Sequence, residues 1–258
     1  LDVNGELLHA AHQLRKQLGT LSPSTRDFLA DVADAAARDW EKPDHGIWEV
    51  RGKPRHFLHS KLMCWVALDR AVAMADQLHA GHRESHWAAT AEKIREAILA
   101  QGWNSETKAF TQYFGAAHLD SAALMIPIVG FLPADDPRVL STIDAITENL
   151  VDARGLVYRY RTGSGVDGLT GDEGTFLLCT FWLAQALALA GRIDDARLVF
   201  ERAADHLNDV GLLAEEIDPT SGSHLGNFPQ TFSHVGLVNA AWAIHQAEIS
   251  RASSEHAP

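Results

Sequence analysis

Hydrophobic residues recur at helical spacing along most of the chain, and two kinds of helical pattern alternate. Some segments are apolar nearly all round, which predicts helices that are buried on most sides. These are 57–78, 121–131, 175–190 and 232–249. The others have one polar face and predict helices at the surface. These are 22–40, 84–100, 137–150 and 193–207. The segment 1–18 also has apolar residues close to helical spacing and is expected to form an inner helix.

The chain repeats a loop, an apolar helix and a two-faced helix. The glycines that open the aromatic loops are Gly46, Gly102, Gly155 and Gly211, so successive units begin 56, 53 and 56 residues apart. No unit of this kind can bury its own faces, so several must pack side by side. We predict an all-α toroid in one domain, with an inner and an outer ring, loops converging on one mouth, and at most short hairpin strands. Residues 250–258 are predicted to be a disordered tail.

Composition narrows the range of partners. The 258 residues are 46% hydrophobic, which is ample for a packed core, and the net charge of -12 comes without any run of Lys or Arg. This argues against nucleic acid and against an anionic membrane surface, whereas a neutral sugar remains compatible. Cys64 and Cys179 lie in apolar runs and are expected to be free core thiols. No apolar run is long enough to span a membrane, no metal-ligand set or cofactor motif is present, and we expect a cytoplasmic location.

Two glutamates lie in corresponding loops of the repeat. Glu49 follows Trp48 in the first loop, and an indole beside a carboxyl group can partly desolvate it, which suits it to donate a proton near neutral pH. Glu215 lies 166 residues later, in the fourth loop. Because such loops converge on one mouth of a toroid, both carboxyl groups can face one pocket. Glycosidic cleavage needs such a pair, one to protonate the departing oxygen and one to activate water.

The other candidate residues each allow a functional and a structural interpretation. Trp48, Trp103 and Tyr113 can offer flat faces to sugar rings or can simply pack at the end of the toroid. Glu173 either answers the dipole of the helix that it precedes or reaches the sugar site. Glu216 either supports its neighbour in the sequence or faces solvent.

Several motifs together resemble the bacterial branch of glycoside hydrolase family 15, the glucoamylase-like enzymes that include bacterial trehalases. The first reads Pro-Asp-His-Gly-Ile-Trp-Glu-Val-Arg-Gly, at positions 43–52. The others lie at 57–61, 65–70, 129–137, 171–176 and 214–218. The resemblance implies an (α/α)6 barrel and inverting hydrolysis of α-glucosides at the non-reducing end, by a general acid and a general base.

Matched residue by residue, the resemblance places the acid on Glu49 and the base on Glu215. Trp48 matches the ring beside the acid. The arginine at the sugar site matches either Arg159 or Arg161. We also count Ile47, Trp103, Tyr113, Glu173 and Glu216 as substrate-binding.

We therefore expect an exo-acting hydrolase that releases glucose from α-glucans or oligosaccharides. A trehalase is the alternative within the family. A non-catalytic toroid that binds carbohydrate or protein is the alternative from another class.

The chain departs from the family pattern in one respect. The Arg-Asp pair that grips the terminal glucose in the family has no counterpart here, and about nine helices are predicted where a closed ring needs twelve. We expect the C-terminal two-thirds of a catalytic domain, which by itself hydrolyses α-glucosides weakly or not at all. Apolar side chains left exposed on the first and last helices would make two copies associate through these edges. They are Val3, Leu7, Leu14, Leu237, Val238, Trp242 and Ile244.

Overall fold

Helices make up most of the residues that the computed structural model describes, which are 1–161 and 173–255. The chain folds as two compact units. Among the described residues, the first unit comprises Leu1–Asn104 and Thr111–Ala116. The second unit comprises Ser105–Phe110 and the described residues from Ala117 onward.

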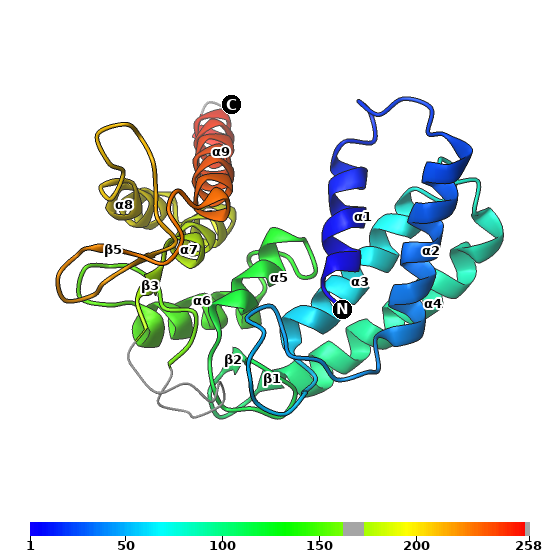
Figure 1. Ribbon diagram of the computed structural model, residues 1–258, viewed down its shortest axis with the longest axis horizontal. Helices are drawn as coiled ribbons and strands as arrows, with labels where there is room; N and C mark the ends of the chain where they lie inside the picture. The colour runs from blue at the N-terminus through cyan, green and yellow to red at the C-terminus, as the bar shows by residue number, and fades with distance from the viewer. Residues whose placement is uncertain (162–172, 256–258) are drawn as a thin grey trace. The chain divides into compact units, whose positions relative to one another are not determined.

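The first unit is built around α3, which packs against α1, α2 and α4 (Figure 1). Its elements are α1 (Val3–Gln13), α2 (Pro23–Asp39), α3 (Leu58–Ala73), α4 (Gly81–Ala97), a π-helical turn (Ile98–Gly102) and β1 (Trp103–Asn104). The start of α2 follows the predicted signals, because Ser22 Oγ accepts the N–H of Thr25 at 3.1 Å and Pro23 opens the helix. Both faces of α3 are buried, as its apolar pattern predicts.

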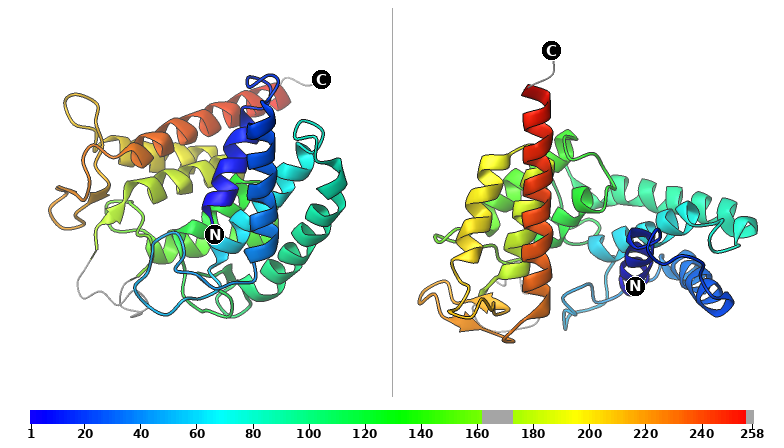
Figure 2. Two further views of the ribbon diagram at one scale, coloured as in Figure 1. Left: turned by 45° about the vertical axis from the view of Figure 1, so that its right-hand side comes forward. Right: turned by 90° about the horizontal axis from the view of Figure 1, so that it is seen from above.

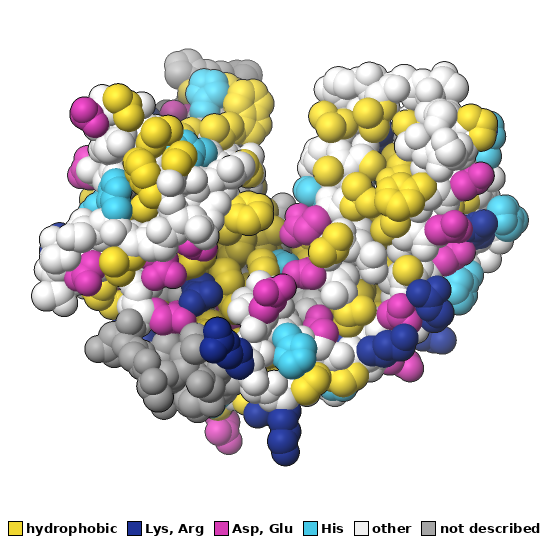
Figure 3. Space-filling model, in the orientation of Figure 1, with side chains coloured by type: hydrophobic (Ala, Val, Ile, Leu, Met, Phe, Trp, Pro, Cys, Tyr) yellow, Lys and Arg dark blue, Asp and Glu magenta, His cyan; other side chains and the backbone are white. Residues whose placement is uncertain are grey.

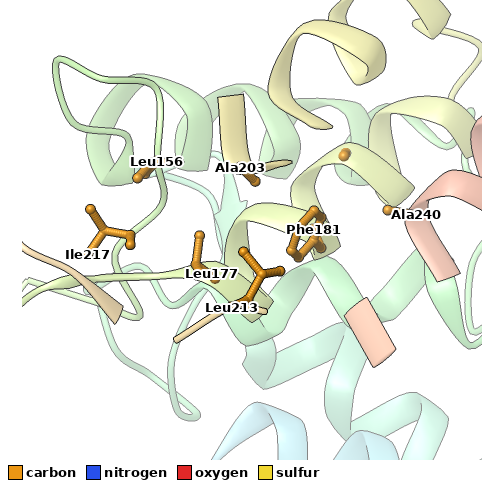
Figure 4. Packing of buried hydrophobic residues seen from close by; sticks show 8 residues of the cluster. Leu156, Leu177, Phe181, Ala203, Leu213, Ile217 and Ala240 are labelled. Carbon is orange, nitrogen blue, oxygen red and sulfur yellow. The ribbon is translucent and has the colours of Figure 1, made fainter. Parts of the chain in front are cut away.

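The second unit is built around α7, which lies against α8 and α9 in both views of Figure 2. Its helices are a 3-10 turn (Ser121–Leu124), α5 (Met125–Ile128), α6 (Pro137–Leu150), α7 (Leu177–Leu189), α8 (Ile193–Ala204) and α9 (Thr231–Glu255). Leu177 and Phe181 of α7 meet Leu213 and Ile217 in a buried cluster with Ala240 of α9 (Figure 4). This cluster anchors the segment that carries Glu215.

Strands are short. They are β2 (Ala109–Phe110), β3 (Thr175–Phe176), β4 (Glu216–Ile217) and β5 (His224–Leu225). The last three form an antiparallel sheet in the order β3-β4-β5, with Phe176 opposite Glu216 and Glu216 opposite Leu225. This confirms the prediction of an all-α fold with only a few short strands.

Three predicted boundaries differ from the structure. The first helix ends at Gln13, where the Arg15 guanidinium donates to the carbonyl oxygen of His12 at 2.7 Å. The helix predicted over 121–131 is a 3-10 turn followed by the four residues of α5, which contain Pro127 with no N–H to give. The predicted tail from 250 is helical as far as Glu255, so its disorder is not seen there.

Four of the seven apolar side chains predicted to be exposed on the edge helices are exposed, whereas Leu7 and Leu237 are half-buried and Ile244 is buried. Val238 and Trp242 of α9 are 62% and 65% exposed, and hydrophobic side chains gather over α9 in Figure 3. Ile244 was wrongly expected among them. It is 7% exposed because it lies one turn beyond the buried Ala240, on the face of α9 that packs inward. Leu237 likewise packs against the buried cluster.

Val3 of α1 is 71% exposed, and Leu14, the residue that caps the C-terminal end of α1, is 50% exposed. Cys64 and Cys179 are both free and buried, as predicted. Within residues 1–161 and 173–255, every helix is too short or too polar to cross a bilayer.

Candidate active site

The loop that carries Glu49 is closed by backbone pairing at its base. Asp44 and Arg55 exchange two hydrogen bonds, with N···O distances of 2.9 and 2.8 Å. Nearer the tip, the N–H of Val50 donates to the carbonyl oxygen of His45 at 3.0 Å, and the ring Nδ1 of His45 donates to that of Val50 at 2.9 Å. Hydrogen bonds within the loop therefore hold its conformation.

The backbone at Glu49 is strained. Its φ is 49°, in the left-handed region that non-glycine residues seldom adopt. Such strain persists only where surrounding contacts hold it, and it gathers at functional sites. Gly46 also has a positive φ, 69°, and its Cα lies so close to the Phe57 ring that a Cβ there would meet ring carbon at 2.8 Å.

The strained backbone presents the carboxyl group outward. Glu49 is exposed, whereas its neighbours Ile47 and Trp48 are half-buried. The partial burial of Glu49 that we expected from Trp48 is thus not present within this chain.

The structure brings Tyr113 to the base of the Glu49 loop. Tyr113 and Phe57 form a backbone bridge, and their rings meet edge to face with centroids 6.0 Å apart. The Arg55 guanidinium lies 4.4 Å from the centroid of the Tyr113 ring. Trp103 is half-buried in the same unit.

In the second unit, the Arg159 guanidinium and the carboxyl groups of Glu173 and Glu216 form a cluster around the short sheet. Arg159 donates to Glu173 Oε1 at 2.5 Å, and the N–H of Gly174 donates to Glu216 Oε2 at 3.2 Å. The Arg159 guanidinium also lies 5.1 Å from the centroid of the Phe176 ring, which is opposite Glu216 in the sheet. The pairing of β3 with β4 brings these groups together. Their positions in the sequence therefore did not predict the cluster. Residues 171 and 172 of the motif at 171–176 lie outside the described residues.

Burial raises the pKa of the Glu216 carboxyl above its ordinary value. The guanidinium of Arg159 opposes this effect, and the negative charges of Glu173 and Glu215 add to it. The Glu216 carboxyl group therefore keeps its proton to a higher pH than a fully exposed glutamate does.

Glu215 is fixed by a residue that the sequence did not single out. Its Oε2 accepts the backbone N–H of Asn227 at 2.8 Å and the side-chain Nδ2–H of Asn227 at 2.9 Å. Gly226 permits this approach, since a Cβ there would come within 2.6 Å of the same oxygen. The only signal for Asn227 in the sequence is the Gly-Asn pair, which is typical of tight turns.

The structure separates the two candidate arginines. Arg161 is exposed, stacks on Tyr158 at 4.1 Å and donates to the carbonyl oxygen of Asn149 at 3.0 Å. Arg159 instead lies in the carboxyl cluster next to Glu216. Glu49 belongs to the first unit and Glu215 to the second, so the separation of their carboxyl groups stays a prediction.

Comparison with known proteins decides the family. Residues 1–242 match the model of the glycosyl hydrolases family 15. The chain belongs to family 15. Among curated members, it is 42% identical over 253 residues to a trehalase of Mycobacterium tuberculosis, a match that covers 98% of this chain and 37% of that protein. It is 38% identical to a trehalase of Thermoplasma volcanium, covering 98% of this chain and 40% of the relative.

Solved structures of the same fold confirm the predicted toroid class. A bacterial glucoamylase complexed with acarbose superposes with a TM-score of 0.79 at 16% identity, over 96% of this chain and 41% of that one. A wild-type glycosidase superposes with a TM-score of 0.77 at 20% identity, over 95% of this chain and 66% of that one. This chain spans only about two fifths of the length of the two family 15 trehalases, 37% and 40%.

Proposed function

We propose that the protein containing this chain is a trehalase that hydrolyses the bond between the two glucose rings with inversion. The observation that carries this proposal is the pair of glutamates, one on the strained Glu49 loop and one held by Asn227 in the second unit. The sequence alone favoured an α-glucan substrate. The curated family 15 relatives named as trehalases, at 42% and 38% identity, favour trehalose instead.

Glu49 is the general acid. Its exposed carboxyl group donates a proton to the glycosidic oxygen as the bond to the anomeric carbon breaks. Glu215 is the general base, which removes a proton from a water that attacks the opposite face of the ring. Inversion at the attacked carbon releases one β-glucose and one α-glucose from each trehalose. Room for the water requires the two carboxyl groups to lie roughly 6.5 to 9.5 Å apart.

The remaining residues hold the sugar. Arg159 and Glu173 offer paired donors and acceptors to its hydroxyl groups, with Glu216 beside them. Arg159, and not Arg161, takes the role of the sugar-site arginine, because only Arg159 lies in the carboxyl cluster. The half-buried rings of Trp48, Tyr113 and Trp103 are proposed to line the site, with Ile47 beside Trp48.

Glucose release tests the proposal in the longest natural polypeptide that contains this chain. The substrates are trehalose, maltose, isomaltose and α-glucosyl fluoride, whose fluoride leaves without protonation. We expect trehalose to be the best of the three sugars. Glu49→Gln should lower the turnover of trehalose by about 10²- to 10⁴-fold and leave the turnover of α-glucosyl fluoride unchanged. Glu215→Gln should lower the turnover of both substrates. Glu84→Gln, at an exposed position on α4, is the matched control and should change neither.

The anomers provide a second measurement. Proton NMR in the first minutes should show β-glucose and α-glucose in equal amounts from trehalose. Two α-glucose molecules as first products would exclude inversion. Full activity of both glutamine variants would exclude the assigned roles, and absence of any turnover by the wild type would favour the non-catalytic binding module.

A further inference from the structure

Lys61 is a buried lysine whose ammonium group binds two backbone carbonyls. It lies in the first turn of α3, and none of its surface is exposed. Its Nζ donates to the carbonyl oxygen of Trp40 at 2.6 Å and to that of Lys42 at 2.5 Å. Burial lowers the pKa of the Lys61 ammonium, and the negative charge of Asp44 opposes this shift.

The two carbonyls mark the start of the Glu49 loop. Trp40 caps the C-terminal end of α2, and Lys42 is the last residue before Pro43. A cation is favourable at this end of a helix, where the carbonyl dipoles point outward. The loop returns to the same place, because Phe57 immediately precedes α3.

Lys61 therefore joins the departing end of the loop to the helix that follows it. Next along the loop, the backbone of Asp44 pairs with that of Arg55. The contact of Gly46 with the Phe57 ring comes one step further toward Glu49. The N–H of Glu49 in turn donates to the carbonyl oxygen of Gly46 at 3.1 Å, so these contacts lead from Lys61 to the strained residue.

A buried ammonium group is costly in itself. An apolar side chain of similar length fills such a site with no loss of stability in many proteins, so packing alone does not explain a lysine here. The ammonium group donates hydrogen bonds to two carbonyl oxygens, which an apolar side chain could not do. These hydrogen bonds fix the place where the loop leaves α2.

We infer that Lys61 is a positioning residue for the general acid, which holds the Glu49 loop at its start so that the Glu49 carboxyl group meets the glycosidic oxygen. This inference rests on the proposed function for the role of Glu49. The hold on the loop itself rests only on the contacts of the first unit.

Lys61→Met tests the inference because it keeps the length of the side chain and removes the donors. The matched control is Trp87→Phe, which removes another partly buried hydrogen bond of the first unit, from the Nε1–H of the buried Trp87 to Asp34 Oδ1 at 2.8 Å. Amide hydrogen exchange is measured at Asp44 and Arg55 in the 258-residue chain. We expect it to speed up in Lys61→Met and to stay at the wild-type rate in Trp87→Phe.

Turnover is measured in the longest natural polypeptide that contains this chain. Lys61→Met should lower kcat for trehalose by on the order of 100-fold with little change in KM, because a small misplacement of a catalytic group has this effect. It should leave turnover of α-glucosyl fluoride near the wild-type value, as expected for Glu49→Gln. If Lys61 had a merely structural role, Lys61→Met would lower turnover of trehalose and of the fluoride alike. Trp87→Phe should lower the turnover of neither substrate.

Unchanged exchange at Asp44 and Arg55 in a folded Lys61→Met would overturn the hold on the loop. An equal loss on trehalose and on the fluoride would overturn the link to the general acid. A wild type that turns over neither substrate defeats the proposed function, while the exchange measurement still decides on the loop. If Lys61→Met does not fold, Lys61→Gln, which keeps one amide donor group, should show the same pattern in weaker form.

Discussion

The pH dependence of stability should reveal His59, which is buried in α3 two residues before Lys61. The side chain of His59 is 3% exposed, and burial lowers its pKa from 6.5 to about 4. The carboxylates of Asp2 and Asp44 oppose this shift, and the N-terminal ammonium adds to it. Asp2 Oδ2 lies 4.0 Å from His59 Nδ1, which is too far for a hydrogen bond.

The sign follows from proton counting. Between pH 6.5 and about 4, the unfolded chain protonates this histidine while the folded chain keeps it neutral. The unfolded state then binds more protons, so the free energy of unfolding falls as the pH falls. The contribution of His59 is fully present above pH 6.5 and is lost as the pH approaches 4. At 1.36 kcal/mol per pKa unit, the loss between pH 7 and pH 4 is about 3 kcal/mol.

Urea unfolding at pH 7, 6, 5 and 4, followed by circular dichroism, measures this loss. Between pH 7 and pH 4, the free energy of unfolding of the wild type should fall by about 3 kcal/mol more than that of His59→Leu, because leucine takes up no proton. His86→Gln, at an exposed position on α4, is the matched control and should run parallel to the wild type. A constant difference between wild type and His59→Leu across the series would refute the reasoning.

Three further predictions follow from single positions. Gly46→Ala should lower the free energy of unfolding by at least about 1–2 kcal/mol, because its φ is 69° and the Phe57 ring blocks a Cβ; a urea midpoint like that of the wild type would contradict this. In the wild type, the folded state keeps the Glu216 proton to a higher pH than the unfolded state, so the free energy of unfolding should fall as the pH rises above 4.5. Glu216→Gln should abolish this fall, and parallel pH series for the two proteins would contradict the prediction. We also expect the 258-residue chain to self-associate through α9, and Trp242→Asp to weaken this in sedimentation velocity; a wild-type monomer would disprove it.

Helices were predictable where the sequence marks both their pattern and their start. Ser22 and Asp136 cap α2 and α6 with side-chain oxygens, and a proline follows each, so both helices begin where the sequence indicates. The segment around Pro127 was not predictable by pattern alone, because its apolar run fits a helix while its proline shortens one. On α9, Ile244 shows that an apolar residue near an edge is assigned to a face only once the neighbouring helices are known.

The candidate site divides in the same way. The sequence singles out Glu49 and Glu215 because the repeat places them in corresponding loops, and their catalytic roles stay a proposal. The partners that fix them were not, because Asn227 and Lys61 act through contacts with distant backbone or side-chain atoms that no periodicity encodes. The choice of Arg159 needed the short sheet, which brings Glu216 next to Gly174 across 42 residues of sequence.

The two proposed catalytic carboxyl groups are held in opposite ways, and this difference fits their roles. Two hydrogen bonds from Asn227 to one oxygen fix the plane of the Glu215 carboxyl group, so its other oxygen can take a proton from a water in a set direction. Glu49 is fixed through its backbone, while its side chain reaches solvent. A general acid must regain a proton from solvent after each turnover, and an exposed carboxyl group does so without any opening of the loop. Rigid placement of the Glu49 backbone, for which Lys61 supplies the first contact, then leaves only the side chain to adjust to the glycosidic oxygen.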